Sequence, residues 1–198
     1  MKSLLIATHN LGKLRETREI LFGLPLRLVT LRDFPGLANI KESGTTFSEN
    51  ASVKARGYAS QTGLWTLADD SGLEVDALDG RPGVFSARYA SGDNQRVARL
   101  LEELSGAKEP SRTACFVCAV AIADDRARII EVTVGKCEGR IALESRGRSG
   151  FGFDPVFIPD GFDATFAEMS PETKNRISHR ARALAAARRV LRRSLLRA

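Results

Sequence analysis

Short apolar segments alternate along this chain with longer segments of helical period, and no other feature of the sequence constrains the fold as strongly. Leu4–Ala7, Leu64–Ala68 and Thr113–Ala123 are apolar runs typical of buried strands. Lys13–Phe22 and Thr46–Gln61 carry apolar residues at the spacing of an amphipathic helix. Because strands and helices that alternate in this way pack as a sheet covered by helices, the pattern predicts an α/β fold.

Two later segments indicate that the sheet is mixed. A helix is expected around Gln95–Leu104, before the third apolar run, and Asp124 and Asp125 then make a turn into a further strand, Ile129–Val134. Strands joined by a short turn pair antiparallel, whereas strands joined through a helix can pair parallel. The 198 residues, 43% of them apolar, fit one globular core without a linker or repeat, so we predict a single domain over residues 1–198.

No segment has the pattern of an export signal or a membrane anchor. The apolar run before Thr8 is too short for the core of a signal peptide, and no later segment approaches the length of a membrane span. Three cysteines, an odd number, agree with a reducing compartment. We therefore expect a cytoplasmic protein that has no membrane partner.

Cys115 and Cys118 have the C-x-x-C spacing of zinc and redox sites, but they lie inside the apolar run Thr113–Ala123. Side chains three residues apart on a strand face opposite sides of the sheet. No second ligand pair with zinc spacing occurs elsewhere in the chain. We therefore predict two small core residues at these positions.

The net charge of +6 would suggest a nucleic-acid partner if it were spread over the whole chain. Instead, nine of the 30 Lys and Arg residues, and no acid, lie from Lys174 onward, which leaves 21 basic against 24 acidic residues before it. Arginines around an apolar stripe are typical of the solvated face of a docked helix. We therefore expect no nucleic-acid partner. The alternative is an RNA-binding tail, whose sign would be salt-sensitive RNA affinity.

Two consecutive carboxylates, Asp69 and Asp70, follow the strand Leu64–Ala68 and precede Ser71 and Gly72. Buried carboxylates repel each other unless water, a cation or hydrogen bonds offset the cost. Acids at a strand end can serve a site, but a solvated turn closed by Gly72 would account for the same residues. The residues alone leave both interpretations open.

The loop between the first strand and the first helix has the composition of an anion site. Thr8 and Asn10 offer short side-chain hydrogen bonds, Gly12 allows a close approach of the backbone, and Lys13 adds a positive charge at the helix start. Free N–H groups and the helix dipole attract anions to such a position. The loop is not a Walker A motif, however, and an ordinary helix start remains possible on these residues.

The second expected helix carries Asn50 and Lys54 one turn apart on the same face, with Glu42 just upstream. A lysine directed inward needs an anionic partner. The alternative is a surface Lys54 paired with an exposed acid, which is common and contributes little.

Three helix ends can be placed from capping residues. Thr46 and Glu49 form a T-x-x-E capping box, and Gly63 supplies a stop at the other end of that helix. Farther on, Ser170 is an expected N-cap with Pro171 in the first helical position.

On one continuous helix after Pro171, the side chains of Lys174, His179 and Arg180 would point in three widely different directions. If they share one ligand, the helix must break between Asn175 and Ser178, with Ser178 capping a second helix. We predict that break.

The segment S-G-F-G-F-D-P-V-F places Phe151 and Phe153 on alternate positions around Gly152, followed by Asp154. Aromatic rings in a loop opened by glycine can stack on a planar base. A strand that enters the core is an equally natural interpretation of the same residues.

Five motifs in order make the chain resemble the inosine triphosphate pyrophosphatases, also described as dITP/XTP pyrophosphatases, which hydrolyse nucleoside triphosphates with abnormal purines. The motifs span nearly the whole chain: ATHNLGKLRE, ESGTTFSENASVKA, LADDSGLEVDALDGRPGVFSARYA, GFGFDPVF and MSPETKNRISHRARAL. The resemblance implies an elongated, two-lobed α/β domain with a mixed sheet and a central cleft. It also implies a homodimer, a Mg²⁺ requirement, and removal of dITP, ITP and XTP from the nucleotide pool.

The resemblance also assigns roles to residues. It implies that the triphosphate is held by Thr8, Asn10 and Lys13, with Lys54 close to it. It implies that Asp70 accepts a proton from water and holds the metal together with Glu42. It implies that the nucleoside end is contacted by Ser71, Phe151, Gly152, Phe153 and Asp154, and that the pocket is completed by Lys174, His179 and Arg180.

Two positions depart from the family pattern. Phe153 stands where the family usually has tyrosine, and Lys41 replaces a frequent acid beside Glu42. The nearest alternative is a related pyrophosphatase that acts on modified pyrimidine or methylated nucleotides, which a comparison of turnover with ITP and XTP would separate.

Overall fold

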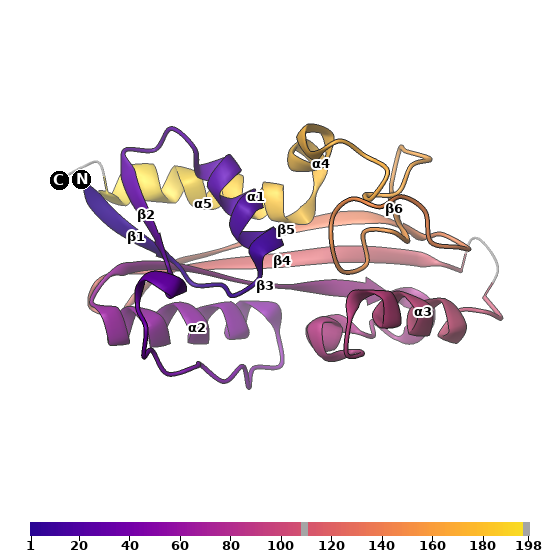
Figure 1. The fold of residues 1–198 in the computed structure, drawn as a ribbon, viewed down its shortest axis with the longest axis horizontal. Coiled ribbons are helices and arrows are strands. Elements are labelled where there is room, and N and C mark those ends of the chain that lie inside the picture. The colour runs from indigo at the N-terminus through magenta and orange to yellow at the C-terminus, as the bar shows by residue number, and fades with distance from the viewer. Residues whose placement is uncertain (108–110, 196–198) are drawn as a thin grey trace. The chain divides into compact units, whose positions relative to one another are not determined.

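The computed structural model describes residues 1–107 and 111–195, and a six-stranded sheet runs through this part of the chain (Figure 1). The strands are β1 (Lys2–Ile6), β2 (Leu26–Thr30), β3 (Trp65–Val75), β4 (Thr113–Ala123), β5 (Ile129–Ile141) and β6 (Phe157–Pro159). The α-helices are α1 (Leu11–Leu21), α2 (Phe47–Thr62), α3 (Asp93–Glu103), α4 (Pro171–Ile177) and α5 (His179–Leu195). Short 3-10 helices lie at Leu31–Asp33, Asp76–Leu78 and Gly83–Arg88.

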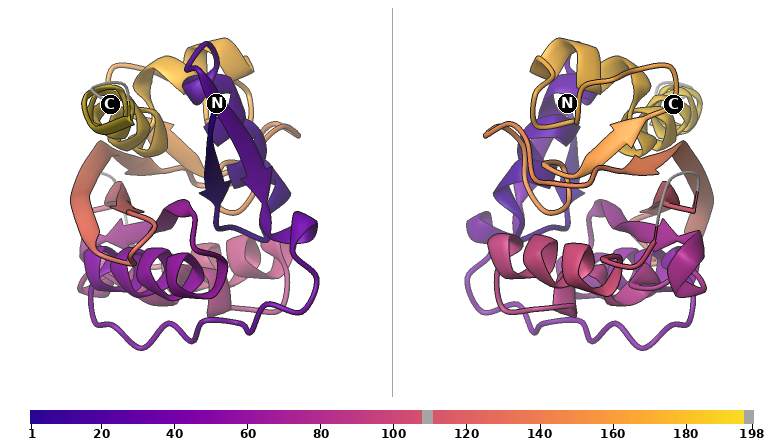
Figure 2. Two further views of the ribbon diagram at one scale, coloured as in Figure 1. Left: turned by 90° about the vertical axis from the view of Figure 1, so that its left-hand side faces the viewer. Right: turned by 90° about the vertical axis from the view of Figure 1, so that its right-hand side faces the viewer.

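The strands hydrogen-bond in the order β2-β1-β3-β4-β5-β6, and the sheet is mixed. β1 pairs parallel with both β2 and β3, whereas β5 pairs antiparallel with β6 (Figure 2). The predicted α/β fold, with helices flanking a mixed sheet, is confirmed. The elongated two-lobed outline, the central cleft and the single domain over residues 1–198 stay predictions.

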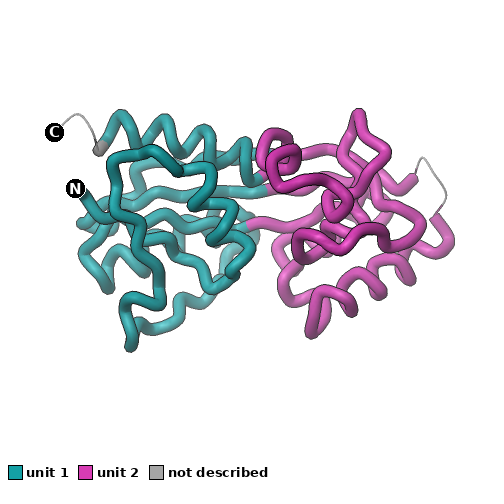
Figure 3. Tube along the Cα trace, turned by 45° about the horizontal axis from the view of Figure 1, so that its top comes forward, with its two compact units in different colours: residues 1–70, 118–135, 180–198 teal, residues 71–117, 136–179 magenta. Residues whose placement is uncertain are grey.

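Two compact units divide the chain (Figure 3). Unit 1 comprises residues 1–70, residues 118–135 and the segment from Arg180 onward. Unit 2 comprises residues 71–117 and 136–179. The strands β3, β4 and β5 therefore each contribute residues to both units.

The core of unit 1 lies between its strands and two helices, α1 and α5. Leu14 and Leu21 of α1 and Leu184 and Leu191 of α5 pack in one cluster with Leu4, Leu67 and Ile122 of the strands. α2 lies on the opposite side of these strands from α5 (Figure 1). This packing brings the start of α1 and the start of α5 to the middle of β3, where the acidic residues lie.

The core of unit 2 is aromatic. The rings of Phe116 and Phe157 lie 4.6 Å apart in an edge contact, and Phe166 packs against both. Leu100 and Leu104, at the C-terminal end of α3, are completely buried in the same cluster. Large rings bury much apolar surface with few rotatable bonds, so they give this unit a rigid base for its loops.

Two predicted strand ends are wrong. β3 does not end at Ala68 but continues to Val75, so Asp69 and Asp70 are interior residues of a strand rather than part of a solvated turn. Lys13 and Arg180 lie near Asp69, and Lys54 lies near Asp70. These cations offset the free-energy cost of burying two carboxylates in a strand. β5 does not end at Val134 but continues to Ile141. The prediction missed this part of the strand because its buried residues alternate with exposed ones and do not form an apolar run.

The predicted helix ends are confirmed. The hydroxyl of Thr46 accepts a hydrogen bond from the backbone N–H of Glu49, the Glu49 carboxylate accepts one from the Thr46 N–H, and Gly63 ends α2 at φ 65°. The hydroxyl of Ser170 caps α4 by accepting from the Thr173 N–H. Ser178 is extended, at φ −65° and ψ 155°, between α4 and α5, so the predicted break is present.

The cysteines carry free thiols, and Cys118 is completely buried, as the apolar run predicts. Burial raises the pKa of Cys118 to about 12 and that of the half-buried Cys115 to about 11, so both thiols stay protonated at neutral pH. Within the described ranges, no helix combines the length and the apolarity that crossing a membrane requires.

Candidate active site

Asp69 has two cationic partners in the interior of unit 1. Its carboxylate is 5% exposed, and its Oδ2 lies 3.0 Å from Nζ of Lys13 and 3.4 Å from Nη2 of Arg180. Burial by itself would raise the pKa of Asp69, but the two cations outweigh it and hold that pKa well below its usual range. Asp69 is therefore a permanent anion that fixes the position of Lys13.

Asp70, the next residue of β3, is 6% exposed and has weaker support for its charge. Its Oδ2 accepts a hydrogen bond of 3.0 Å from the side-chain amide of Asn50, and its Oδ1 lies 3.8 Å from Nζ of Lys54. Burial raises the pKa of Asp70 above its usual value, because the ammonium and the amide offset the desolvation only in part. A carboxylate whose pKa is raised toward neutrality is suited to accept a proton.

Lys54 brings a second carboxylate to the same place. Its Nζ lies 2.9 Å from Oε1 of Glu42 as well as near Asp70, and its side chain is only 12% exposed. Burial would lower the pKa of Lys54, but the surrounding carboxylates outweigh it and raise that pKa. The alternative of an exposed, surface-paired Lys54 is therefore wrong.

The donor set near Lys54 fits Mg²⁺. The carboxylates of Glu42 and Asp70 both lie near the ammonium of Lys54, and carboxylate oxygens are ligands that Mg²⁺ prefers. Among the described residues, no group of three or more His, Cys, Asp or Glu side chains could hold a metal. Mg²⁺ does not need such a group, because it commonly binds to one or two carboxylates and completes its shell with phosphate oxygens and water.

The loop before α1 folds as an N-cap. The side-chain oxygen of Asn10 accepts a 3.1 Å hydrogen bond from the N–H of Lys13, and the hydroxyl of Thr8 accepts one of 3.2 Å from the N–H of Asn10. Asn10 is exposed and Thr8 is half-buried. The free N–H groups at the start of α1 therefore lie at an accessible helix N-terminus beside Lys13, an arrangement suited to phosphate.

Arg180 is buried against Glu16, a partner that sequence reasoning did not anticipate. It is 2% exposed, and its Nη1 lies 2.6 Å from Oε2 of Glu16, while its Nη2 reaches Asp69. Both terminal nitrogens are thus engaged by buried carboxylates, and the direct contact of Arg180 with a nucleotide stays a prediction. Sequence reasoning missed Glu16 altogether, although it follows Lys13 at i+3 on one helix face.

In unit 2, Asp154 organises the loop after Gly150. Its Oδ2 accepts a 2.8 Å hydrogen bond from the N–H of Phe151 and lies 2.6 Å from Nζ of the buried Lys174. That ammonium lies 4.9 Å from the centre of the Phe151 ring. The turn requires Gly150, since a Cβ there would lie 2.1 Å from Oδ2 of Asp154.

The other predicted residues of unit 2 have structural contacts as well. Phe153 is 3% exposed and packs edge-on against Tyr89, so this ring enters the core, whereas the Phe151 ring stays half-buried. The His179 ring stacks on Phe116 at 4.5 Å. Ser71 is half-buried in β3.

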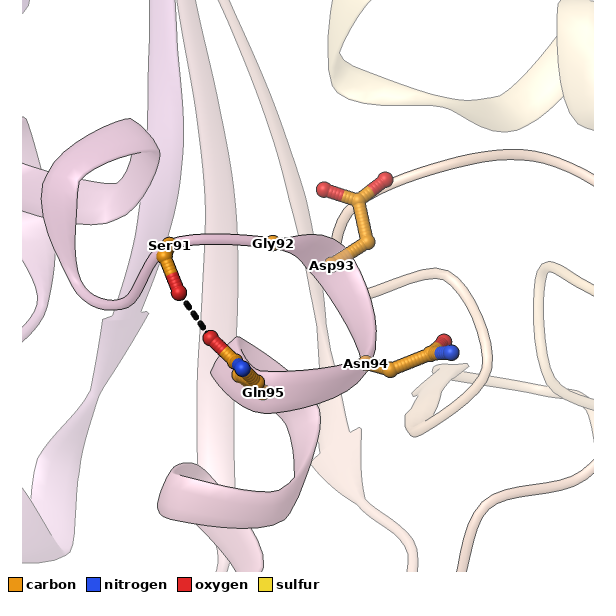
Figure 4. A pocket seen from close by; sticks show the side chains of 5 residues that line it. All are labelled: Ser91, Gly92, Asp93, Asn94 and Gln95. Carbon is orange, nitrogen blue, oxygen red and sulfur yellow. Dashed lines mark hydrogen bonds between the residues drawn. The ribbon is translucent and has the colours of Figure 1, made fainter.

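An open pocket of about 450 Å³ at the start of α3 is a feature that the sequence did not indicate (Figure 4). Its lining residues are Ser91, Gly92, Asp93, Asn94 and Gln95. Asp93 connects it with the loop described above, because Oδ2 of Asp93 accepts a 2.8 Å hydrogen bond from the N–H of Gly152.

The predicted site residues thus divide between the two units. Unit 1 carries Thr8, Asn10, Lys13, Glu42, Lys54, Asp70 and Arg180. Unit 2 carries Ser71, Phe151, Gly152, Phe153, Asp154, Lys174 and His179. The first set is rich in cations and carboxylates, whereas the second combines two phenylalanine rings with one buried ion pair.

Comparison with known proteins gives consistent matches over nearly the whole chain. The family model described as the Ham1 family matches residues 4–190. A dITP/XTP pyrophosphatase of Desulforamulus reducens is 46% identical over 193 residues, covering 96% of each chain. One of Geobacter sulfurreducens is 48% identical over 188 residues, covering 93% of this chain and 94% of the relative. The solved structure of a HAM1 protein from Coxiella burnetii has a TM-score of 0.89 at 41% identity, covering 98% of this chain and 100% of that one.

Proposed function

This chain belongs to the Ham1 family, and we propose that it hydrolyses the noncanonical purine nucleoside triphosphates dITP, ITP and XTP to the monophosphate and pyrophosphate, with Mg²⁺ as cofactor. The observation that carries the proposal is the pair of buried, consecutive carboxylates Asp69 and Asp70 beside two ammonium groups, those of Lys13 and Lys54. The opposite directions in which their pKa values are shifted agree with this assignment. The names of the relatives, dITP/XTP pyrophosphatase, support the same reaction and substrates.

In the proposed reaction, water attacks the α-phosphorus of the nucleotide. Asp70 accepts a proton from the water as the new bond from oxygen to phosphorus forms. The bond from the α-phosphorus to the bridging oxygen breaks, and pyrophosphate leaves with the electron pair. Mg²⁺, when bound by Glu42 and Asp70, would supply positive charge at the phosphate oxygens.

The bound triphosphate carries about four negative charges near neutral pH, and they must be offset before water can approach phosphorus. Lys13, Lys54 and the N–H groups that follow Thr8 and Asn10 provide this offset in the proposal. Arg180 contributes indirectly, because it holds Asp69, which in turn holds Lys13.

The nucleoside end of the substrate is assigned to the residues of unit 2. The half-buried ring of Phe151 offers a face for a planar base, with Gly152, Phe153 and Asp154 forming its loop. Ser71, Lys174 and His179 complete the proposed set. Hypoxanthine and xanthine present a carbonyl at position 6, where adenine presents an amino group, so a buried donor left unmatched by adenine would cost about 1–3 kcal/mol.

The finer statements from the sequence belong to the same proposal. We infer that the protein acts in the cytoplasm and as a homodimer, with a nucleoside triphosphate as its small-molecule partner. Size-exclusion chromatography with light scattering tests the homodimer, which a monomer at micromolar concentration would contradict.

The decisive experiment measures pyrophosphate release from ITP, XTP, dITP, GTP and ATP, with and without Mg²⁺, for the wild type and for Asp70→Asn. We expect turnover of the hypoxanthine and xanthine nucleotides to exceed that of ATP by one or two orders of magnitude, because a buried donor left without an acceptor costs about 1–3 kcal/mol. Release of single phosphates, or faster turnover of a methylated or modified pyrimidine nucleotide, would contradict the proposal.

A further inference from the structure

Asp93, the first residue of α3, connects two segments of unit 2 that are far apart in the sequence. Its Oδ2 accepts the 2.8 Å hydrogen bond from the N–H of Gly152, and its Oδ1 lies 2.6 Å from Nη1 of Arg96. Nε of Arg96 in turn donates to the carbonyl of Ala90 at 3.2 Å. The carboxylate is therefore held by the start of its own helix while it binds the distant loop.

The loop from Gly150 to Asp154 depends on such anchors. Gly150 and Gly152 have φ values of 80° and 63°, in the left-handed region, and glycine adds no side chain that could pack. Two consecutive N–H groups of this loop, those of Phe151 and Gly152, donate to carboxylates: the first to Asp154 of the loop itself, the second to Asp93. Asp93 thus supplies a fixed point from outside the loop.

The Gly152 anchor controls where the Phe151 ring lies, because the two residues share a peptide group. The same ring lies 4.9 Å from Nζ of Lys174, which is bound to Asp154 at 2.6 Å. The position of the ring therefore depends on two contacts, one with a buried, paired cation and one through a backbone amide that Asp93 holds. If the amide were released, the ring would gain conformational freedom that a ligand must remove on binding.

We propose that Asp93 is a positioning residue for the nucleoside, which it orders by fixing the Phe151–Gly152 segment before the substrate binds. The proposal rests on the proposed function, in which this segment contacts the nucleoside. Asp93 acts through the loop amide and does not itself touch the substrate.

Kinetics with ITP separate this role from a general effect on the enzyme. Asp93→Ala removes the acceptor, and we expect KM to rise about five- to tenfold, with kcat within about twofold of the wild type, as for loss of one charge-assisted hydrogen bond. Asp93→Asn loses the ion pair with Arg96 but keeps one acceptor oxygen for the Gly152 N–H, so its KM should lie closer to that of the wild type than to that of Asp93→Ala. Asn94→Ala, which alters the exposed residue next to Asp93, is the matched control and should leave both constants unchanged.

Hydrogen exchange of the peptide that spans residues 149–156 tests the anchoring without any substrate. In Asp93→Ala we expect exchange in this peptide to accelerate about five- to tenfold, whereas Asp93→Asn and Asn94→Ala stay near the wild type. The melting temperature of each variant verifies that the unit remains folded.

The possible outcomes are distinct. Unchanged exchange in Asp93→Ala would overturn the anchoring, and faster exchange with an unchanged KM would overturn the role in nucleoside positioning. An equal rise of KM in Asp93→Asn would also overturn the proposal, since the acceptor would then be irrelevant. If the wild type does not hydrolyse ITP at all, the proposed function fails and with it the nucleoside role, while the exchange data still decide whether Asp93 anchors the loop.

Discussion

Asp69 and Asp70 are consecutive residues of one buried strand, yet their partners shift their pKa values in opposite directions. Asp69 lies within 3.4 Å of both Lys13 and Arg180, whereas Asp70 has the more distant Lys54 and a neutral amide. Successive side chains on a strand face opposite sides, which allows two adjacent acids to have different surroundings. One of them is thereby suited to hold cations and the other to accept a proton.

Replacing Asp70 by Asn should remove the proton acceptor and leave the fold intact. We expect kcat for ITP to fall by about 10²–10⁴, the usual contribution of general base catalysis. Asp79→Asn changes an exposed acid, whose left-handed φ of 52° Asn tolerates, and it should retain wild-type activity in the same pyrophosphate assay. Activity of Asp70→Asn close to that of the wild type would show that the acids serve only the structure.

The same two positions should respond oppositely in stability at pH 7. Asp69→Asn leaves Lys13 and Arg180 without their shared anion, so we expect the free energy of unfolding to fall by about 3–5 kcal/mol. Asp70→Asn removes a charge that burial disfavours, so we expect it to raise the free energy of unfolding. Urea titration of both variants measures the two signs, and destabilisation of equal size in both would contradict this account.

The stabilisation by Asp70→Asn should depend on pH. Because the pKa of Asp70 is higher in the folded than in the unfolded state, its contribution to stability is fully present below the unfolded pKa of 3.8 and is lost as the pH rises through the folded pKa. Below pH 3.8 the protonated Asp70 resembles Asn, so the difference between the variant and the wild type should vanish there. Thermal melts from pH 3 to pH 8 measure this difference in stability. A difference that stays constant over this pH range would show that the protonation of Asp70 does not cause it.

Removal of Mg²⁺ by EDTA should abolish turnover, and added Mg²⁺ should restore it. Glu42→Gln removes one of the two carboxylates near Lys54, so we expect the Mg²⁺ concentration for half-maximal activity to rise on the order of tenfold. Glu144→Gln, at an exposed position, is the control and should leave the Mg²⁺ requirement unchanged. Titration with Mn²⁺ followed by electron paramagnetic resonance gives a second measure, and equal affinities in wild type and Glu42→Gln would argue against this ligand.

Asp154→Asn should weaken nucleotide binding more than it slows the reaction. The change breaks the buried 2.6 Å ion pair with Lys174 and weakens the acceptor for the Phe151 amide. We expect KM for ITP to rise about tenfold or more, because a buried cation is left without its anion. Asp160→Asn, an exposed acid close by in the sequence, should behave as the wild type. A fall confined to kcat would place Asp154 in the chemical step instead.

Local patterns predicted most of the fold. The capping box at Thr46, the stop at Gly63 and the break at Ser178 each depend on a few neighbouring residues, and each is confirmed. The length of β3 could not be predicted in this way. Asp69 and Asp70 are compatible with a buried strand only because Lys13, Arg180 and Lys54 neutralise them from other elements, and no local pattern reports such partners.

The site divides along the same line. The N-cap at Asn10 follows from a spacing of three residues, and the need of Lys54 for an anionic partner could be anticipated, although not which acid supplies it. The burial of Arg180 against Glu16 joins residues 164 positions apart, and the bond between Asp93 and Gly152 spans 59. Contacts of this kind arise from the packing of whole elements, so a single sequence does not disclose them.

Because Ser178 interrupts the helix, α5 begins anew at His179, and Arg180 lies in its first turn. The direction of the Arg180 side chain therefore depends on how this first turn is placed. The exposed arginines of its last turns, Arg192 and Arg193, can therefore be replaced by residues of another charge, or used to attach the protein to a surface, without displacing the Arg180 guanidinium from Asp69. The last turns of α5 are therefore a suitable place to attach the protein to a solid support.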